Sequence, residues 1–417
     1  MPHCTIRSVS SVDARFPLPP GAGTDAVHTD AEYCMAITSL ETDSRITGAG
    51  IALTLGNGNR LVCDAITMLG QSLCNREIEE LMAQFGGVSR SLAEHPSLRW
   101  LGPHKGVVHL ALASIANACF DLWAKHRRVP LWKLLLDLTP EELVSLLDLT
   151  YLEDILPRAE AAQMLRDNRA TRAEREGILS SGYPGYDTSV GWMGYDDEKV
   201  RKLATQALDQ GFHALKLKVG SEDSARDLRR AAILRELMGD SGLLMFDANQ
   251  HWSLPQAMSM CRELAPFKPF WIEEPTHPDD IFGHAALARE VAPVRIAAGE
   301  HIPNRILFRN FMQYGALHFA QPDCTRLAGV GEFLTVSLLA KKFGLPLVPH
   351  VGDMGQIHQH LVLFNHTALA HQVVFLEHIP HLREYFAFPA SLHGGSYVTP
   401  QEPGASTDMI LPGDTRR

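Results

Sequence analysis

Charged side chains recur at nearly equal intervals along the second half of the chain. The series begins with Lys216 and Lys218 and continues, one strand-plus-helix length at a time, through Asp247, Glu273, Glu300, Asp323, His350 and Glu377. In a barrel of alternating strands and helices, residues at the C-terminal ends of the strands meet at one mouth. The spacing therefore predicts that these side chains converge on a single site.

The three middle carboxylates, Asp247, Glu273 and Glu300, are the kind of oxygen ligands that hold a hard divalent cation. Asp247 follows Phe246, and Glu273 follows an equally apolar run. Surface acids rarely follow such runs, although any one of these carboxylates alone is more often a surface group or a helix cap. Three carboxylates at the corresponding ends of successive strands favour a site for Mg²⁺, with Mn²⁺ as the alternative.

Lys216 and Lys218 stand two positions apart, so on a strand both side chains point to the same face. Repulsion between the two ammonium groups, partial burial and a nearby cation are expected to lower a lysine pKa, so that one lysine acts as a base near neutral pH. A Lys-x-Lys pair alone is more often a solvated strand edge. The position of this pair in the charged series favours the interpretation that one of the two lysines acts as a base.

His350 follows an apolar run, and Asp323 ends the run before it, which predicts a dyad in which the carboxylate orients the imidazole and stabilises its protonated form. Glu377, after the last run, is either a substrate contact or a capping acid. The remaining histidines in this half are interpreted as buried structural residues: His301, His318, His358, His360 and His371.

The elements that must position these residues form a βαβ series, which indicates a parallel sheet. The expected strands lie at 186–190, 214–219, 243–247, 270–273, 294–298, 317–321, 345–349 and 373–377. This number of strands predicts a closed (β/α)₈ barrel. A doubly wound sheet is the competing fold, but the G-x-G-x-x-G that follows its first strand is absent from the sequence.

Length and composition limit the class of protein. At 417 residues the chain exceeds what one core usually fills, so two domains are expected. The net charge of -10 disfavours non-specific binding to nucleic acid or to an anionic membrane, and a small-molecule substrate fits better. The apolar stretch 107–124 is interrupted by polar residues, which predicts a buried helix and no membrane span.

Cysteine usage and the N-terminal sequence bear on the cellular compartment. The seven cysteines are scattered and form no C-x-x-C pair, which indicates reduced thiols. The N-terminal sequence lacks the basic start and apolar region of a secretory signal, so a cytoplasmic location is expected. Barrels of this kind often associate, so a homo-oligomer stays an open alternative.

The ordered motifs resemble the enolase superfamily, in its mandelate racemase-like branch. They are Lys216-Leu217-Lys218, Asp247-Ala248-Asn249-Gln250, Trp271-Ile272-Glu273-Glu274-Pro275, Gly299-Glu300 and Pro349-His350. A closer likeness, to the L-fuconate dehydratase family and its animal homologues, covers nearly the whole chain. It is carried by Gly23-Thr24-Asp25-Ala26, His28-Thr29-Asp30, Lys105-Gly106-Val107-Val108-His109-Leu110, Gly182-Tyr183-Pro184-Gly185-Tyr186 and Gly194-Tyr195.

The resemblance implies an α/β fold: a (β/α)₈ TIM-like barrel with an α+β N-terminal capping domain. The expected bounds are 1–135 for the capping domain, 136–181 for a helical connection, 182–380 for the barrel and 381–417 for a C-terminal segment that returns to the capping domain. Asp247, Glu273 and Glu300 would hold Mg²⁺. The substrate would contact Gly23, Thr24, Asp25, Tyr33, Lys216, Asn249, Glu300 and Glu377.

The resemblance also implies a reaction. Lys218 would abstract the proton α to the substrate carboxylate, Lys216 would tune Lys218, and His350 with Asp323 would protonate the departing β-hydroxyl. Because an α-proton of a carboxylate is weakly acidic, the cation must stabilise the enediolate. The product would be a 2-keto-3-deoxy sugar acid, with L-fuconate giving 2-keto-3-deoxy-L-fuconate.

Two departures from the family pattern leave other functions open. Asp353 stands where the family usually has glycine, and the stretch between His350 and Glu377 is shorter than usual. The alternatives are an acid-sugar racemase or epimerase that uses Lys218 and His350 as opposed bases, and a catalytically silent homologue with a binding or regulatory role.

Overall fold

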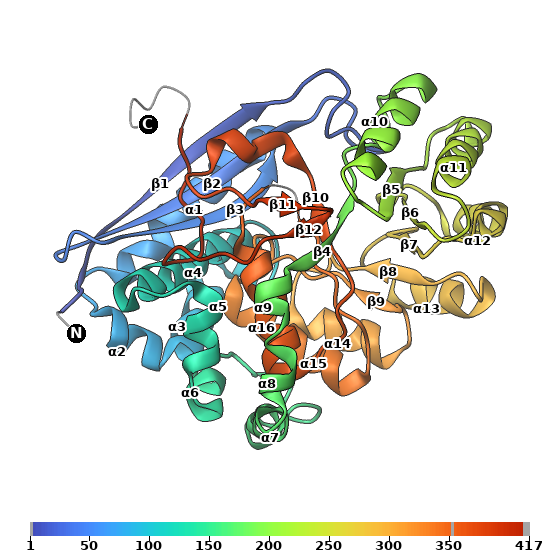
Figure 1. The fold of residues 1–417 in the computed structure, drawn as a ribbon. Helices are drawn as coiled ribbons and strands as arrows, with labels where there is room; N and C mark the ends of the chain where they lie inside the picture. The colour runs from blue at the N-terminus through green and yellow to red at the C-terminus, as the bar shows by residue number, and fades with distance from the viewer. Residues whose placement is uncertain (1–2, 352–353, 412–417) are drawn as a thin grey trace.

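A capping sheet with its helices lies beside a barrel of parallel strands ringed by helices (Figure 1). The computed structural model describes residues 3–351 and 354–411. This architecture confirms the predicted (β/α)₈-type barrel with an α+β N-terminal cap.

The capping sheet is antiparallel, in the order β1 (Ile6–Pro17), β2 (Glu32–Thr42) and β3 (Thr47–Leu55). Helix α4 (Gly106–Arg127) lies directly on it. A Cβ atom at Gly50 would come within 1.9 Å of the Ser114 carbonyl oxygen and 2.3 Å of the Ala118 nitrogen, so only glycine permits this approach. The Ser114 hydroxyl, 2.8 Å from the Ala36 carbonyl, also joins the helix to the sheet.

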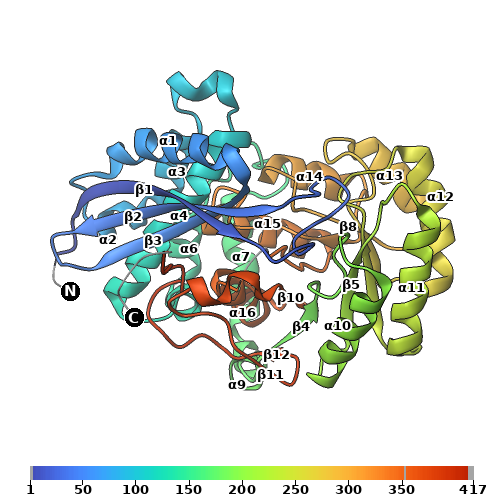
Figure 2. The ribbon, with the colours of Figure 1, turned by 90° about the horizontal axis from the view of Figure 1, so that it is seen from above.

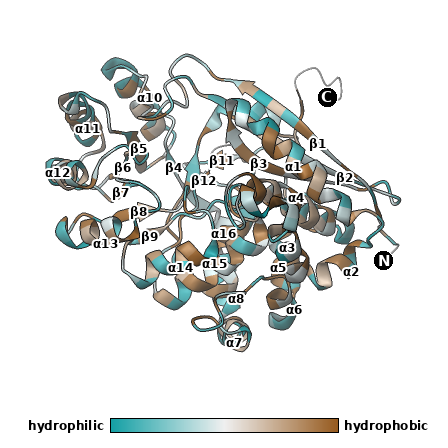
Figure 3. Ribbon diagram, turned by 180° about the vertical axis from the view of Figure 1, so that it is seen from behind, coloured by the Kyte–Doolittle hydropathy of each residue, from teal (hydrophilic) through white to brown (hydrophobic). Residues whose placement is uncertain are grey.

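Helix α4 is the predicted buried helix. By length and hydropathy alone it could cross a membrane, but 89% of its most apolar window is buried inside the protein. In Figure 3 hydrophobic residues concentrate on α4 in the interior, whereas outer helices such as α11 (Ser224–Met238) and α12 (Leu254–Leu264) show hydrophilic faces. The apolar composition of α4 therefore reflects its central position in the core.

The other helices before the barrel are short. Helix α6 begins at Pro140, as the sequence predicts, and Thr139 and Glu142 form a capping box at its start. The α-helices are α1 (Asn59–Gly70), α2 (Ile78–Ala83), α3 (Phe85–Ala93), α5 (Leu131–Asp137), α6 (Pro140–Ser145), α7 (Arg158–Arg169), α8 (Arg172–Arg175) and α9 (Ile178–Ser181). The 3₁₀ helices are η1 (Gly56–Gly58), η2 (Gln71–Leu73) and η3 (Pro96–Leu101).

The barrel strands run parallel to one another, and the last strand pairs with the first. The strands are β4 (Tyr183–Asp187), β5 (Ala214–Lys218), β6 (Leu243–Asp247), β7 (Trp271–Glu273), β8 (Ile296–Ala298), β9 (Phe319–Ala320) and β10 (Leu376–His378). The remaining helices are α10 (Asp197–Asp209), η4 (Ala265–Phe267), α13 (Ile281–Glu290), α14 (Arg305–Gln313), α15 (Val330–Phe343) and α16 (Ile357–Leu369).

Most predicted strands differ from the observed ones by one to three residues at an end, and two of the differences concern the seventh and the first barrel strands. The expected run 345–349 forms only an isolated bridge, from Leu347 to Ala320. The first barrel strand begins at Tyr183, earlier than the expected residue 186. Pro184 and Gly185 look like turn residues in the sequence, but proline is tolerated near the start of a strand, where its missing N–H is not required.

Aromatic side chains fill the barrel below its mouth. The ring centroids of Tyr186 and Trp271 are 5.7 Å apart, and those of Trp271 and Phe319 are 5.2 Å apart. All three side chains are buried. The barrel interior is therefore a packed core, and the polar strand ends above it form the floor of the site.

The C-terminal segment joins the barrel to the cap. It passes through η5 (Pro380–Tyr385) and a hairpin of β11 (Leu392–His393) and β12 (Ser396–Tyr397), and β12 pairs with β4. Beyond the hairpin, the Ala405 N–H donates to Asp121 of α4 over 2.7 Å. The segment, red in Figure 2, thus lies between the capping sheet and β4.

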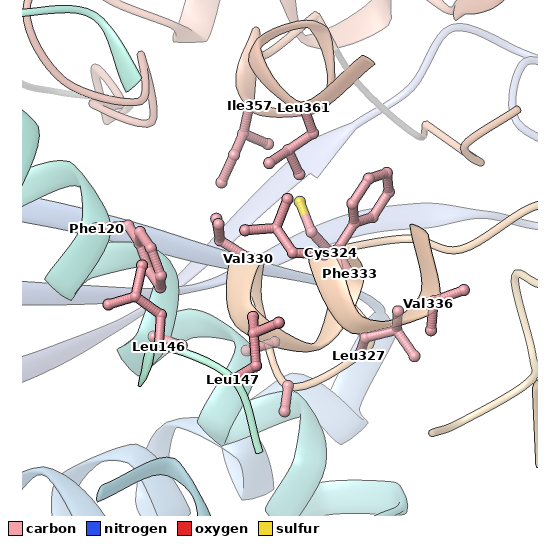
Figure 4. Packing of buried hydrophobic residues seen from close by; sticks show 14 of the residues in the cluster. Phe120, Leu146, Leu147, Cys324, Leu327, Val330, Phe333, Val336, Ile357 and Leu361 are labelled. Atoms are coloured by element: carbon pink, nitrogen blue, oxygen red, sulfur yellow. The ribbon is translucent and has the colours of Figure 1, made fainter. Parts of the chain in front are cut away.

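Cap and barrel share one hydrophobic core. Figure 4 shows Phe120 of α4 and Leu146 and Leu147 of the connection beside residues of α15 and α16, among them Val330, Phe333, Ile357 and Leu361. Since these residues belong to a single buried cluster, the cap is held firmly against the barrel.

A buried polar cluster crosses the same junction. His109 of α4 contacts Glu332 of α15 over 2.5 Å, and Glu332 pairs with Arg305 of α14 over 3.1 Å. Arg305 also pairs with Asp148 of the connection over 2.7 Å. His109 lies in one of the family-type motifs of the sequence, and its observed place is at this junction.

Candidate functional site

A cavity of about 270 Å³ lies between the barrel mouth and the cap. The barrel contributes Lys218, Asn249, Glu300, Arg326, His350 and Glu377 to its lining. The cap contributes Gly23, Asp25, Tyr33, Leu53 and Leu55. Four of the eight residues in the charged series, Lys218, Glu300, His350 and Glu377, therefore line one cavity.

Three successive strand ends bring the carboxylates of Asp247, Glu273 and Glu300 together. One oxygen of each lies within 4.8 Å of the others, and all three side chains are buried. Glu300 comes next to Gly299, where a Cβ atom would lie 2.3 Å from the Gln321 backbone. This glycine lets the chain pass close to the neighbouring strand end and aim Glu300 at the group.

The donor set fits a hard divalent cation, because it offers only carboxylate oxygens. The Oε2 atom of Glu300 is buried and has no hydrogen-bond partner among the described residues. Burial raises the pKa of Glu273 to about 7, although Lys216 opposes this shift. Gathering three buried acids is costly, and a bound cation would relieve the repulsion that remains between them.

The two lysines on β5 point into the same group of acids. Lys218 Nζ lies 2.6 Å from Asp247 Oδ2, and Lys216 Nζ lies 2.9 Å from Glu273 Oε1 and 2.8 Å from Glu377 Oε1. Lys216 is fully buried below the cavity. The strand alternation thus places both side chains inside the barrel, as the Lys-x-Lys spacing predicts.

The expected lowering of a lysine pKa includes the charge of a bound cation and stays a prediction; the protein groups alone raise the pKa of both lysines. Burial lowers the pKa of Lys218, but Asp247 outweighs burial and the repulsion of Lys216, so the pKa lies above its ordinary value. For Lys216, burial is likewise outweighed, chiefly by Glu273 and Glu377. The prediction counted the repulsion between the lysines, partial burial and a nearby cation, but it did not count the carboxylates that other strands bring beside the lysines.

His350 and Asp323 lie together on the opposite side of the carboxylate group. His350 Nδ1 is 2.8 Å from Asp323 Oδ2, and its Nε2 is 3.4 Å from Glu300 Oε2. Burial lowers the pKa of His350, but Glu300 and Asp323 outweigh burial and raise the pKa above its ordinary value. The arrangement therefore favours a protonated imidazole that faces the cavity.

Glu377 is held from several sides at the end of β10. Its Oε1 accepts from the Thr188 hydroxyl over 2.5 Å and pairs with Lys216, and its Oε2 accepts from the Val351 N–H over 3.1 Å. Glu377 lines the cavity, so it is available to a bound molecule as well as to Lys216.

The cap residues named from the sequence occupy different positions. Gly23, Asp25 and Tyr33 line the cavity, and Asp25 pairs with His28 over 3.0 Å. Thr24 has another place. Its hydroxyl donates to the Gly21 carbonyl over 2.8 Å and accepts from the Gly194 N–H over 2.7 Å. Thr24 thus fastens the cap loop to the barrel loop that follows β4.

Several cavity residues were missed by the sequence analysis, among them His301, Arg326 and Trp192. His301, interpreted as a buried structural residue, instead faces the cavity, with Nδ1 3.0 Å from Glu274. Arg326 lies 3.2 Å from Glu300. The available signal was their position, because His301 directly follows Glu300 and Arg326 comes one turn after Asp323.

The other histidines are buried or half-buried and have mainly structural contacts. His318 and His360 accept backbone N–H groups, and His371 contacts the Ser337 carbonyl. His358 is buried as expected, but its Nε2 lies 3.0 Å from Asp323 Oδ1. Asp353, where the sequence departs from the family pattern, lies outside the described residues.

Comparison with known proteins identifies relatives along the whole chain. The family model described as enolase C-terminal domain-like matches residues 199–410. The human mitochondrial enolase superfamily member 1 is 42% identical, over 97% of this chain and 93% of its own. Its crystal structure matches with a TM-score of 0.95, over 98% of this chain and 95% of the other.

Two further relatives carry the names of enzymes. The L-galactonate dehydratase of Hypocrea jecorina is 41% identical, over 98% of this chain and 93% of its own. The L-talarate/galactarate dehydratase of Salmonella typhimurium, solved with Mg and L-lyxarohydroxamate, is 25% identical with a TM-score of 0.79, over 100% of this chain and 93% of the other.

Proposed function

Because the chain belongs to the enolase superfamily, we propose that it is a Mg²⁺-dependent acid-sugar dehydratase that acts on a six-carbon monocarboxylic sugar acid such as L-fuconate. The product is then 2-keto-3-deoxy-L-fuconate. The dehydratases among its relatives support the reaction class, and the Mg bound in the Salmonella structure supports the cation. The predicted cytoplasmic location, use of Mn²⁺ and self-association stay predictions.

One observation carries the proposal. Lys218 and His350 line one cavity, Asp323 lies 2.8 Å behind His350, and the three-carboxylate group contacts both Lys218 and His350. Removal of water from a sugar acid needs a base at the α-carbon, an acid at the β-hydroxyl and stabilisation of the negative charge between the two events. Lys218 supplies the base and His350 supplies the acid, and the three carboxylates would hold the cation that stabilises the negative charge.

Each side chain has a defined task in this proposal. Lys218 takes the α-proton, and Lys216, fixed between Glu273 and Glu377, presents its positive charge beside Lys218. His350 donates its proton to the β-hydroxyl as the carbon–oxygen bond breaks, and water leaves. When bound to Asp247, Glu273 and Glu300, the cation supplies Lewis-acid stabilisation of the substrate carboxylate and a positive charge that lowers the lysine pKa.

The size and the lining of the cavity suit a small, partly apolar substrate. The cavity volume of about 270 Å³ lies just below the usual range of ~300–1,000 Å³ for ligand pockets, which suits a small ligand. Leu53, Leu55 and Ile379 contribute apolar surface, which can pack against the methyl group of a 6-deoxy sugar acid. Asp25 offers a hydrogen-bond acceptor to hydroxyl groups at the same wall.

The test is a screen of acid sugars for keto-acid formation, with the semicarbazide assay, with Mg²⁺ or with EDTA. We expect L-fuconate to give a keto acid only when the cation is present. Lys218→Ala should abolish exchange of the α-proton with solvent deuterium, and His350→Asn should block dehydration while exchange continues. Exchange without keto acid in the wild type would favour a racemase or epimerase. Absence of both reactions, with Mg²⁺ bound, would overturn the proposal.

A further inference from the structure

Trp192 forms one wall of the cavity beside the proposed base. It lies in the loop that follows β4, is buried, and lines the cavity together with Lys218. The Nζ atom of Lys218 lies over the Trp192 ring, 5.5 Å from its centroid. An ammonium at this distance faces the π surface of an aromatic ring. The flat face of the indole is therefore turned toward the point at which a substrate must present its α-carbon to Lys218.

The polar edge of the indole is already occupied. Its Nε1–H donates to His381 Nε2 over 2.9 Å, and the ring centroids of the two residues are 5.7 Å apart. Burial lowers the pKa of His381 to about 4, so near neutral pH the imidazole is neutral and carries its proton on Nδ1. Because a tryptophan side chain has no other polar atom, Trp192 can contact a ligand only through the carbon atoms of its ring.

Three segments of the chain hold this wall in place. The Trp192 carbonyl accepts from the buried Arg230 of α11 over 2.7 Å. A Cβ atom at Gly191 would lie 2.5 Å from a carbonyl oxygen of β5, so glycine lets the loop lie against this strand. His381 of the C-terminal segment also packs edge-on against Tyr33 of the cap, with ring centroids 6.4 Å apart. The barrel, the C-terminal segment and the cap thus all restrain the indole.

We propose that Trp192 is a substrate-positioning residue: the carbon chain of the sugar acid packs on the indole face, which holds the α C–H bond against Lys218. The polar groups of the cavity suit the oxygen atoms of such a substrate, and its C–H groups need a surface of another kind. The face of an aromatic ring carries partial negative charge, which suits polarised C–H groups. His381 accepts the indole N–H and so keeps this face turned toward Lys218. This role rests on the proposed function.

A binding experiment separates contact with the substrate from an effect on Lys218 itself. Titration calorimetry measures the Kd of L-fuconate in the Mg²⁺-loaded Lys218→Ala protein, which has no ammonium at this position and no base for turnover. Adding Trp192→Leu should raise this Kd about 10-fold, the effect of losing about two buried methylene contacts. Trp132→Leu is the matched control and should leave the Kd within about twofold. The buried indole of Trp132 also donates to the C-terminal segment, at the Pro400 carbonyl, but it is not one of the described residues that line the cavity.

A double-mutant cycle tests the hydrogen bond between Trp192 and His381. With Lys218 intact and Mg²⁺ present, His381→Leu should lower kcat/KM for α-proton exchange of L-fuconate about 10-fold, because a small misplacement of reacting groups lowers a rate strongly. In a Trp192→Phe background, whose ring has no N–H to donate, His381→Leu should change kcat/KM by less than about twofold. A merely structural role of His381 would lower kcat/KM equally in both backgrounds.

Either of two results would overturn the inference: a Kd that Trp192→Leu leaves unchanged, or equal losses in the two arms of the cycle. If the wild type binds L-fuconate but catalyses neither exchange nor dehydration, the proposed function fails, and the calorimetry alone decides whether the ligand packs on Trp192. If the Mg²⁺-loaded wild type does not bind L-fuconate, the proposed substrate and the positioning role fail together.

Discussion

Arg305→Met removes the cation at the centre of the junction between cap and barrel. The guanidinium is 3% exposed and bonds to Glu332 over 3.1 Å, Asp148 over 2.7 Å and the Thr150 carbonyl over 3.2 Å. Methionine fills much of the same space but leaves both carboxylates without this partner. Breaking a buried pair by removing one member costs about 3–5 kcal/mol. Since His109 still contacts Glu332, we expect a loss of about 3 kcal/mol in the free energy of unfolding.

Arg309→Met provides the comparison on the same helix. Arg309 donates to the Tyr151 carbonyl over 3.0 Å and lies 3.6 Å from Asp154, whose side chain is 68% exposed. Such surface pairs contribute about 1 kcal/mol or less. Urea unfolding at neutral pH, followed by tryptophan fluorescence and far-ultraviolet circular dichroism, measures both variants. If Arg305→Met and Arg309→Met lose equal stability, the buried cluster does not stabilise the junction.

Three further variants test other parts of the structure. Burial raises the pKa of Glu332, but His109 and Arg305 outweigh burial and keep this pKa below its ordinary value of 4.5. The Glu332 carboxylate therefore stabilises the fold above about pH 4.5, and that stability is lost as the pH falls toward the pKa of the folded state. Urea midpoints at about pH 6 and about pH 3.5 should therefore differ less in Glu332→Gln than in the wild type; an equal difference contradicts this role. Gly50→Ala should lower the free energy of unfolding by about 3 kcal/mol, because the added methyl group meets the backbone of α4. Gly87→Ala is the control, because a methyl group there meets nothing within 4 Å, and it should not lower stability. Thermal unfolding compares the two variants. Glu300→Gln should weaken Mg²⁺ binding at least about 10-fold in titration calorimetry, and an unchanged affinity would remove Glu300 from the ligand group.

The barrel could be predicted from the sequence because its signals are local. Asp247 and Glu273 directly end buried strands, and Lys216 and Lys218 share a face through the two-residue period of a strand. Parallel pairing then brings these ends together without any further information. The buried helix α4 was equally accessible, since its apolar composition and length restrict it to a core.

The remaining features depend on contacts between distant segments. The lysine pKa values are set by Asp247, Glu273 and Glu377, which come from three other strands. His301 and His358 look alike in the sequence, yet one faces the cavity and the other accepts from the Cys324 N–H. His301 lies in a loop, which has no period, and α16 is buried on almost all sides, so its helical period does not show which partner His358 meets.

The return of residues 396–408 to the cap has a consequence for synthesis on the ribosome. Asp121 of α4 is fully buried, and its carboxylate accepts from Ala49 and Ala405, while Lys125 beside it pairs with Asp408. An N-terminal half that emerges first has the sheet and α4 but lacks Ala405 and Asp408. Lys125 on the same helix already pairs with Asp121, but the nascent cap lacks the Ala405 N–H and the Asp408 carboxylate until the C-terminal segment has been translated, so its set of contacts is completed late.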